Sequence, residues 1–202
     1  EEEQAEEHIE GELIFEHTEP LIDLTLDSQG RVVFMDQLGD AWQCDAYGSL
    51  TKLIDVNMID PLGMAFVSGG RLAAVDLTGE VFFSSGEPES IQTSAEIHAF
   101  TVNSFGTILA YINPQSTSLR GLILAAGKEQ EFIDCGERLT DLSFSADNRY
   151  LGIGTENSGI LIFDMAKRQI TQKLAQSGLR SVIQIVPGDH GGWVAAYESG
   201  KV

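Results

Sequence analysis

The sequence predicts an all-β protein built from a repeat of about 40 residues. Apolar residues alternate with polar ones in short runs, as expected of half-buried strands. Clusters of Asp, Asn, Gly and Ser separate these runs and are typical of tight turns. A turn glycine also returns at nearly constant spacing, at Gly39, Gly79, Gly159 and Gly200, with Leu119 near the corresponding place in the third unit.

The clearest unit covers residues 139–164, LTDLSFSADNRYLGIGTENSGILIFD. Leu142 and Phe144 alternate with two serines, and turns at 146–148 and 156–159 separate three short apolar runs. Tight hairpin turns need a positive φ, which glycine adopts without a steric penalty from Cβ. The unit therefore predicts antiparallel hairpins.

The elements follow in chain order. Residues 1–10 are acidic without an apolar stripe, which indicates a linker or a disordered lead-in. Residues 12–17, ELIFEH, predict a lone outer strand with Leu13 and Phe15 on one face. Residues 11–202 then hold the repeats, in units at approximately 20–57, 61–95, 97–135, 138–175 and an incomplete 179–202. The expected strands are 21–26, 31–35, 41–44 and 50–56; 62–67, 71–75, 80–83 and 90–94; 97–102, 107–112, 120–125 and 129–134; the run around 142–144, then 150–154, 160–163 and 169–174; and 181–186 and 193–197.

Residues 143–164 carry a family resemblance. SFSADNRYLGIGTENSGILIFD resembles the WD40 repeat, with Phe163 and Asp164 where the repeat has Trp-Asp. The other units share the period and the alternation over roughly residues 11–202 but lack the dipeptide, and none has the Gly-His pair that usually precedes a blade. The resemblance implies a WD40-like β-propeller of four-stranded antiparallel blades, with other seven- or eight-bladed families as alternatives.

The number of units predicts an incomplete ring. Four full units, a lone strand and half of a fifth unit are fewer than a ring of six to eight blades requires. A five-bladed ring would need residues 12–17 as its fourth strand and a further strand after Gly200. Unpaired strand edges are an aggregation hazard. We therefore expect either a segment of a larger chain or a propeller whose remainder an additional chain supplies.

Charge and composition limit the partners. The chain has 31 acidic and 12 basic residues, a net charge of −19, and residues 1–19 contribute nine glutamates. This charge repels nucleic acid and anionic membranes, so we expect neither as a partner. Another protein, including one with a basic surface, suits this charge; plain solvation and a high-salt source are the alternatives.

Further features of the sequence favour a cytoplasmic setting. No apolar run approaches the ~18 residues of a membrane helix, and the acidic N-terminus does not have the pattern of a signal peptide. Cys44 and Cys135 lie two units apart, too far for a disulfide, so we expect two free thiols in a reducing compartment.

Polar residues recur where the second strand of each unit ends, and they form a candidate interaction face. An acidic ring there would bind a basic peptide or a cation; alternatively, these side chains hydrogen-bond their own turns. Trp42 joins the face as a partner anchor if it is exposed, and otherwise packs between units as Trp193 does. The recurring residues are Asp36, Asp76, Asn113, Glu156 and Glu198.

No catalytic or metal-binding pattern is present in the sequence. The histidines, His8, His17, His98 and His190, lack the spacing of metal ligands, and His98 beside Phe100 predicts a packed core side chain. We expect no cofactor, no metal and no enzyme activity.

Three functions remain open. The first is a non-catalytic protein–protein interaction scaffold or regulatory module that presents loops such as 113–118. The alternative is a ligand- or cation-binding or enzymatic propeller with a polar site at its central channel. A third is a purely architectural segment of a larger chain.

Overall fold

The structure, a computed structural model, describes residues 15–174, 181–188 and 192–200, and it confirms that this part of the chain is all-β. Four antiparallel sheets of four strands and one sheet of two strands follow one another along the chain. The first sheet contains β1 (Leu21–Leu26), β2 (Val32–Asp36), β3 (Ala41–Cys44) and β4 (Leu50–Ile54). The second contains β5 (Pro61–Val67), β6 (Arg71–Asp76), β7 (Glu80–Phe83) and β8 (Ser90–Gln92), with a short 3₁₀ turn at Ser68–Gly70.

The remaining sheets repeat the same strand order. The third contains β9 (Ala99–Val102), β10 (Ile108–Ile112), β11 (Ser118–Ile123) and β12 (Lys128–Asp134). The fourth contains β13 (Leu139–Phe144), β14 (Tyr150–Thr155), β15 (Ile160–Asp164) and β16 (Gln169–Leu174). The fifth contains β17 (Val182–Pro187) and β18 (Trp193–Tyr197). Each strand expected from residue 21 onward has a counterpart.

The lone strand expected at residues 12–17 has no counterpart in the described residues. Residues 15–17 are not in a strand, and residues 12–14, like the acidic lead-in at 1–10, lie outside the described part. Phe15 instead stacks on Phe34 of β2, with ring centroids 4.9 Å apart. Phe15, the described member of the alternating pair, therefore packs on an aromatic ring of the first sheet.

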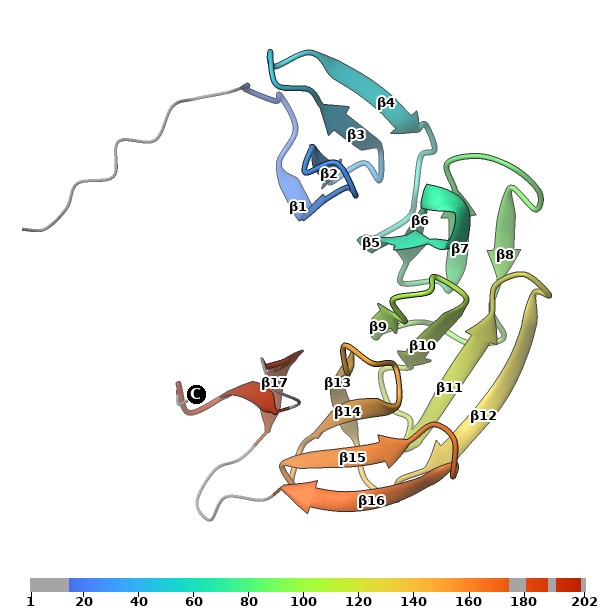
Figure 1. Cartoon of the computed structure of the whole chain (residues 1–202), viewed down its shortest axis with the longest axis vertical. Helices are drawn as coiled ribbons and strands as arrows, with labels where there is room; N and C mark the ends of the chain where they lie inside the picture. The colour runs from blue at the N-terminus through green and yellow to red at the C-terminus, as the bar shows by residue number, and fades with distance from the viewer. Residues whose placement is uncertain (1–14, 175–180, 189–191, 201–202) are drawn as a thin grey trace, which may run out of the picture.

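The sheets follow one another along an open arc, and in each four-stranded sheet the first strand lies on the inner side and the fourth on the outer side (Figure 1). The first strands of neighbouring sheets contact each other. Four hydrophobic clusters fill the spaces between consecutive sheets; in one of them, Met35 and Ala41 of the first sheet pack with Met64 and Leu72 of the second. The core is thus divided into layers between sheets, and the described residues do not close into a ring.

The recurring turn glycines have the conformation that their spacing predicts. Gly39 and Gly79 have φ values of 84° and 90°. A Cβ on Gly79 would lie 2.4 Å from the carbonyl oxygen of Ala95, so the turn also requires the absence of a side chain. The corresponding turn of the third sheet begins at Asn113 and contains no glycine.

Two other expectations can be compared with the structure. Cys44 is buried and Cys135 is half-buried, and both are free thiols, as predicted. Within the described ranges, no helix has the length and apolar character that crossing a bilayer requires.

Candidate functional site

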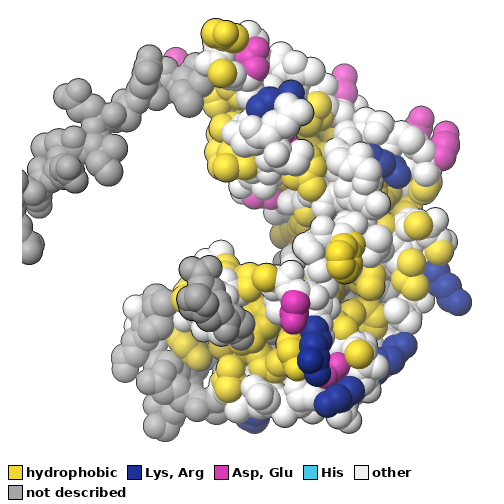
Figure 2. Space-filling model, in the orientation of Figure 1, with side chains coloured by type: hydrophobic (Ala, Val, Ile, Leu, Met, Phe, Trp, Pro, Cys, Tyr) yellow, Lys and Arg dark blue, Asp and Glu magenta, His cyan; other side chains and the backbone are white. Residues whose placement is uncertain are grey.

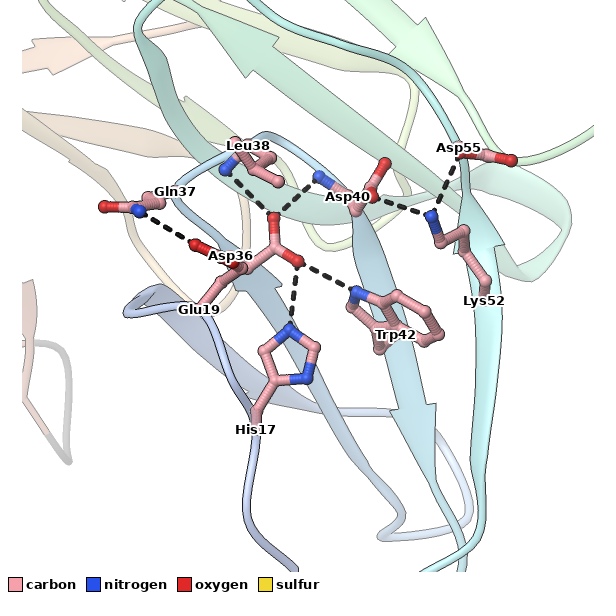
Figure 3. A network of polar contacts seen from close by, with 9 residues as sticks. All are labelled: His17, Glu19, Asp36, Gln37, Leu38, Asp40, Trp42, Lys52 and Asp55. Atoms are coloured by element: carbon pink, nitrogen blue, oxygen red, sulfur yellow. Dashed lines mark hydrogen bonds and ion pairs between the residues drawn. The ribbon is translucent and has the colours of Figure 1, made fainter.

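A polar network is centred on Asp36 at the end of β2 (Figure 3). Its Oδ1 accepts hydrogen bonds from the backbone N–H groups of Leu38 and Asp40, at 3.0 and 3.1 Å. Its Oδ2 lies 3.0 Å from the indole Nε1 of Trp42 and 3.0 Å from Nε2 of His17. One buried carboxylate therefore joins the β2–β3 turn, the third strand and the segment that precedes β1.

Trp42 is half-buried, with a neighbour on each side. The His17 ring meets it edge-on, with centroids 5.5 Å apart, and Lys52 Nζ lies 4.7 Å from its ring centroid. Lys52 in turn contacts carboxylate oxygens of Asp40 at 2.7 Å and Asp55 at 3.0 Å. Trp42 is therefore not the exposed partner anchor that the sequence allowed.

The second tryptophan has a different setting. Trp193 packs against the cluster between the fourth and fifth sheets, in agreement with the inter-unit packing predicted for it.

The electrostatics of Asp36 reflect these contacts. Burial raises the pKa of this carboxyl group, but the hydrogen bonds from His17, Trp42 and the turn amides outweigh burial and lower the pKa below 3.8. Asp36 is thus ionised at neutral pH with four donors around it. A carboxylate occupied in this way holds a structure together and is poorly placed to transfer protons or bind a cation.

Asp76 has the same role in the second sheet, because its Oδ1 accepts from Thr78 Oγ1 at 2.7 Å and from the N–H of Glu80 at 2.9 Å. The other members of the candidate face differ from Asp36 and Asp76. Asn113 is half-buried and its Oδ1 has no partner in the described residues, whereas Glu156 and Glu198 are exposed.

Strand register shows that the five recurring residues do not occupy one equivalent position. Leu21 of β1 pairs with Asp36, whereas the corresponding Leu139 and Val182 pair with Thr155 and Tyr197. Glu156 and Glu198 therefore lie one residue farther along and correspond to Gln37 and Leu77. Backbone N–H groups at this later position donate to the residue before the first strand, at 2.9 to 3.1 Å: Gln37 to Pro20, Leu77 to Asp60, Glu156 to Arg138 and Glu198 to Ser181. The five residues therefore do not form a single acidic ring. The alternative, in which each side chain hydrogen-bonds its own turn, applies to Asp36 and Asp76.

The histidines also differ from expectation. His98 is exposed, so its prediction as a packed core residue was wrong. It precedes β9 at the place where Ile22 and Ile183 form bulges in the first and fifth sheets, and an extra residue there turns the side chain outward. His17, which the sequence left without a role, belongs to the Asp36 network; His8 and His190 lie outside the described residues.

Two carboxylates that the sequence did not single out join neighbouring sheets. Asp23 Oδ2 accepts from the N–H of Met64 at 2.8 Å, and Asp141 Oδ2 accepts from the N–H of Ile185 at 2.7 Å. Both are third residues of first strands, so alignment of the first and fourth units would have matched them. Burial raises the pKa of Asp141 despite the opposing hydrogen bonds from Ile185 and Leu142.

Neither a metal site in the described part of the chain nor a similar known protein indicates the function, so the function has to be argued from the contacts described above. The described residues contain no group of three or more His, Cys, Asp or Glu side chains that could hold a metal ion. The chain was compared with protein-family models and with curated proteins. No family model matches it, and no curated protein matches it.

Proposed function

We propose that this protein is a non-catalytic interaction scaffold, formed by part of a WD40-like β-propeller. In this proposal, further blades from additional chain pack on both ends of the arc, and the turns are presented to a partner protein. The repeated four-stranded sheets, their inner-to-outer strand order and their face-to-face packing support the propeller. The observation that carries the proposal is the exposure of apolar side chains on the two end faces.

The first end face belongs to the first sheet. Leu24 pairs with Phe34, and Met64, Leu142 and Ile185 occupy the equivalent paired position in the second, fourth and fifth sheets. Met64, Leu142 and Ile185 are 6%, 4% and 2% exposed, because a preceding sheet covers each of them. Leu24 is 58% exposed, as is Leu26 on the same face. The position is buried in the second, fourth and fifth sheets. In the first sheet Phe15 and His17 cover the neighbouring Phe34, but no described residue buries Leu24.

The second end face belongs to the fifth sheet. Val194 occupies the position of Val33, Ala73 and Ala110, all of which are fully buried by the next sheet. Val194 is 46% exposed, and Val186 beside it is 43% exposed. Burying a Leu or Val side chain stabilises by about 1.5–3 kcal/mol. Both ends of the arc therefore favour association with another sheet of the same kind.

The recurring polar residues argue against the alternative of a ligand, cation or enzyme site at a central channel. That site would need several free carboxylates at one equivalent position. Those of Asp36 and Asp76 accept bonds from their own turns, and the exposed Glu156 and Glu198 lie one residue farther along the register. Turns held in this way can vary outward-facing residues without loss of geometry, which suits a scaffold. The net charge of −19 favours a basic patch on the partner, and the two free thiols suit a reducing, cytoplasmic setting.

Site-specific crosslinking tests the proposal. A photoreactive phenylalanine analogue is placed at Leu24 or at Val194 of the protein expressed in its own cells. Tyr47, 94% exposed in the β3–β4 turn, provides the matched control outside both end faces. We expect both end-face positions to crosslink to chain that carries the same repeat, whereas the control position does not.

Purification at low and at moderate salt accompanies the crosslinking. A stoichiometric partner that is lost at moderate salt is the result expected for an electrostatic contact with the acidic surface. If neither end-face position crosslinks to repeat-bearing chain and the protein purifies alone at both salt concentrations, the proposal is wrong.

A further inference from the structure

A cleft of about 590 Å³ opens between the third and fourth sheets, on the side of the turns that join β9 to β10, β13 to β14 and β15 to β16. Its volume lies within the range of small-ligand and side-chain pockets. Hydrophobic and basic side chains lie next to one another over these two sheets (Figure 2). The cleft is therefore a local exception on the surface of a strongly acidic protein.

The floor of the cleft is aromatic. Phe132, Phe144 and Phe163 belong to the cluster between the third and fourth sheets, and they are 9%, 6% and 0% exposed. On the rim, Phe105 of the β9–β10 turn is 67% exposed, although it is not needed to fill the core. Such a floor and rim accept one bulky apolar side chain.

Two arginines complete the rim, and contacts with the protein hold both of them. Arg168 donates from Nη1 to Gln130 Oε1 at 3.3 Å and from Nη2 to the carbonyl oxygen of Glu131 at 3.1 Å. Arg149 lies over the ring of Tyr150 at 5.0 Å, with Nη2 3.9 Å from Asp164 Oδ2. A guanidinium has five N–H donors, so donors remain on each for a ligand carboxylate.

Backbone geometry sets Arg168 apart. Its φ of 55° is in the left-handed region. The equivalent residue of the third sheet, which also comes just before the first paired residue of the fourth strand, is Gly127, with φ 57°. A side chain there is tolerated at a cost in stability, and such strain collects at functional positions. The neighbouring wall is fixed because Ser104 N donates to Asn148 Oδ1 at 2.7 Å, which joins two turns.

We infer that this cleft binds a peptide segment of a partner protein that presents a bulky apolar side chain beside a carboxylate. The apolar side chain enters over the three phenylalanines, and the carboxylate lies between Arg149 and Arg168. This inference rests on the proposed scaffold function and names one contact through which the scaffold holds its partner.

Fluorescence anisotropy of a labelled hexapeptide tests the inference with the whole 202-residue chain. The probe contains one phenylalanine followed by two glutamates. One matched peptide replaces the phenylalanine by alanine, and another replaces the glutamates by glutamines. We expect the probe to bind at least tenfold more tightly than either matched peptide.

Variants separate binding from folding. Arg168→Gly removes the guanidinium and relieves the left-handed backbone, so we expect at least tenfold weaker binding with an unchanged or higher urea midpoint. Arg149→Gln is expected to weaken binding similarly. Arg31→Gln, which removes a partly exposed arginine paired with Asp27 in the first sheet, should leave the affinity within twofold.

Several results would overturn the inference. They are equal binding of the three peptides, wild-type affinity in Arg168→Gly, and a dimer of the wild-type protein that Arg168→Gly dissociates, because a second copy would then occupy the cleft. If the end-face crosslinks form but the probe does not bind, this inference alone fails. If neither occurs and the protein also purifies alone at both salt concentrations, the scaffold function fails with it.

Discussion

Replacing Asp36 by asparagine should destabilise the protein because a buried donor loses its acceptor. The amide oxygen can keep the bonds from Leu38 and Asp40, but the amide NH₂ then faces the donors of Trp42 and His17. A buried donor left without an acceptor costs about 1–3 kcal/mol. The loss for Asp36→Asn is therefore about 1–3 kcal/mol, because the indole N–H of Trp42 loses its acceptor whereas the His17 ring can change tautomer and accept from the amide.

Asp76→Asn is the matched control. Asp76 is as buried as Asp36, but Oδ1 alone accepts both of its bonds, from Thr78 and Glu80. An amide oxygen can take over that role, so we expect a loss below about 1 kcal/mol. Urea unfolding at neutral pH, followed by tryptophan fluorescence and circular dichroism, measures both variants.

The pH dependence gives an independent check on the same carboxylate. The folded-state pKa of Asp36 is lowered, so its stabilising contribution is present above its ordinary pKa of 3.8 and is lost as the pH falls through the folded-state pKa. The difference between wild type and Asp36→Asn should therefore shrink in acid. Equal losses for Asp36→Asn and Asp76→Asn, or a difference that does not change with pH, would refute the reasoning.

Three further predictions concern single positions. Asp141→Asn should be neutral or stabilising at pH 7, because the amide oxygen still accepts from the N–H of Ile185. Burial raises the pKa of Asp141, so the stabilising contribution of this group is present below pH 3.8 and is lost as the pH rises. Urea unfolding of both proteins at two pH values measures this difference. Gly79→Ala should lower stability by about 2–4 kcal/mol, against about 1–2 kcal/mol for Gly30→Ala. Both glycines have a positive φ, but only a Cβ on Gly79 would clash with a backbone oxygen. A similar urea midpoint for the two variants would contradict the clash. In an ultraviolet titration Tyr111 should ionise near pH 12, because burial and the 2.7 Å bond to Glu129 raise the pKa of Tyr111 to about 12. Tyr111→Phe should remove that late phase, and the stability of the wild type should fall as the pH rises from about 10 toward 12.

The strands could be predicted because their signals are local. Alternating side chains and turn glycines determine where strands such as β3 and β16 begin and end, and both match their expected bounds. Residues 12–17 have the same alternation, yet Phe15 packs on Phe34 rather than pairing in a sheet. Periodicity alone does not distinguish a paired strand from an extended segment that covers a face.

The site depended on contacts that the sequence does not encode locally. His17 and Asp36 are 19 residues apart, and Ser104 and Asn148 are 44 apart, so no short motif announces either pair. The sequence left an acidic ring open because acidic residues recur where the second strands end, but Asp36 is the last residue of its strand whereas Glu156 and Glu198 follow theirs. A one-residue offset places Glu156 and Glu198 at a different register position from Asp36.

The layered core has a consequence for how the protein loses structure. Each hydrophobic cluster joins only two consecutive sheets, so a disturbance in one sheet reaches distant sheets only through those between them. Such an array frays from its ends. Amide hydrogen exchange should therefore be slowest in β10 and β14 and fastest in β1 and β18. Covering an end face would slow exchange first in the sheet next to it, so an exchange gradient along the arc would report which end a partner has reached.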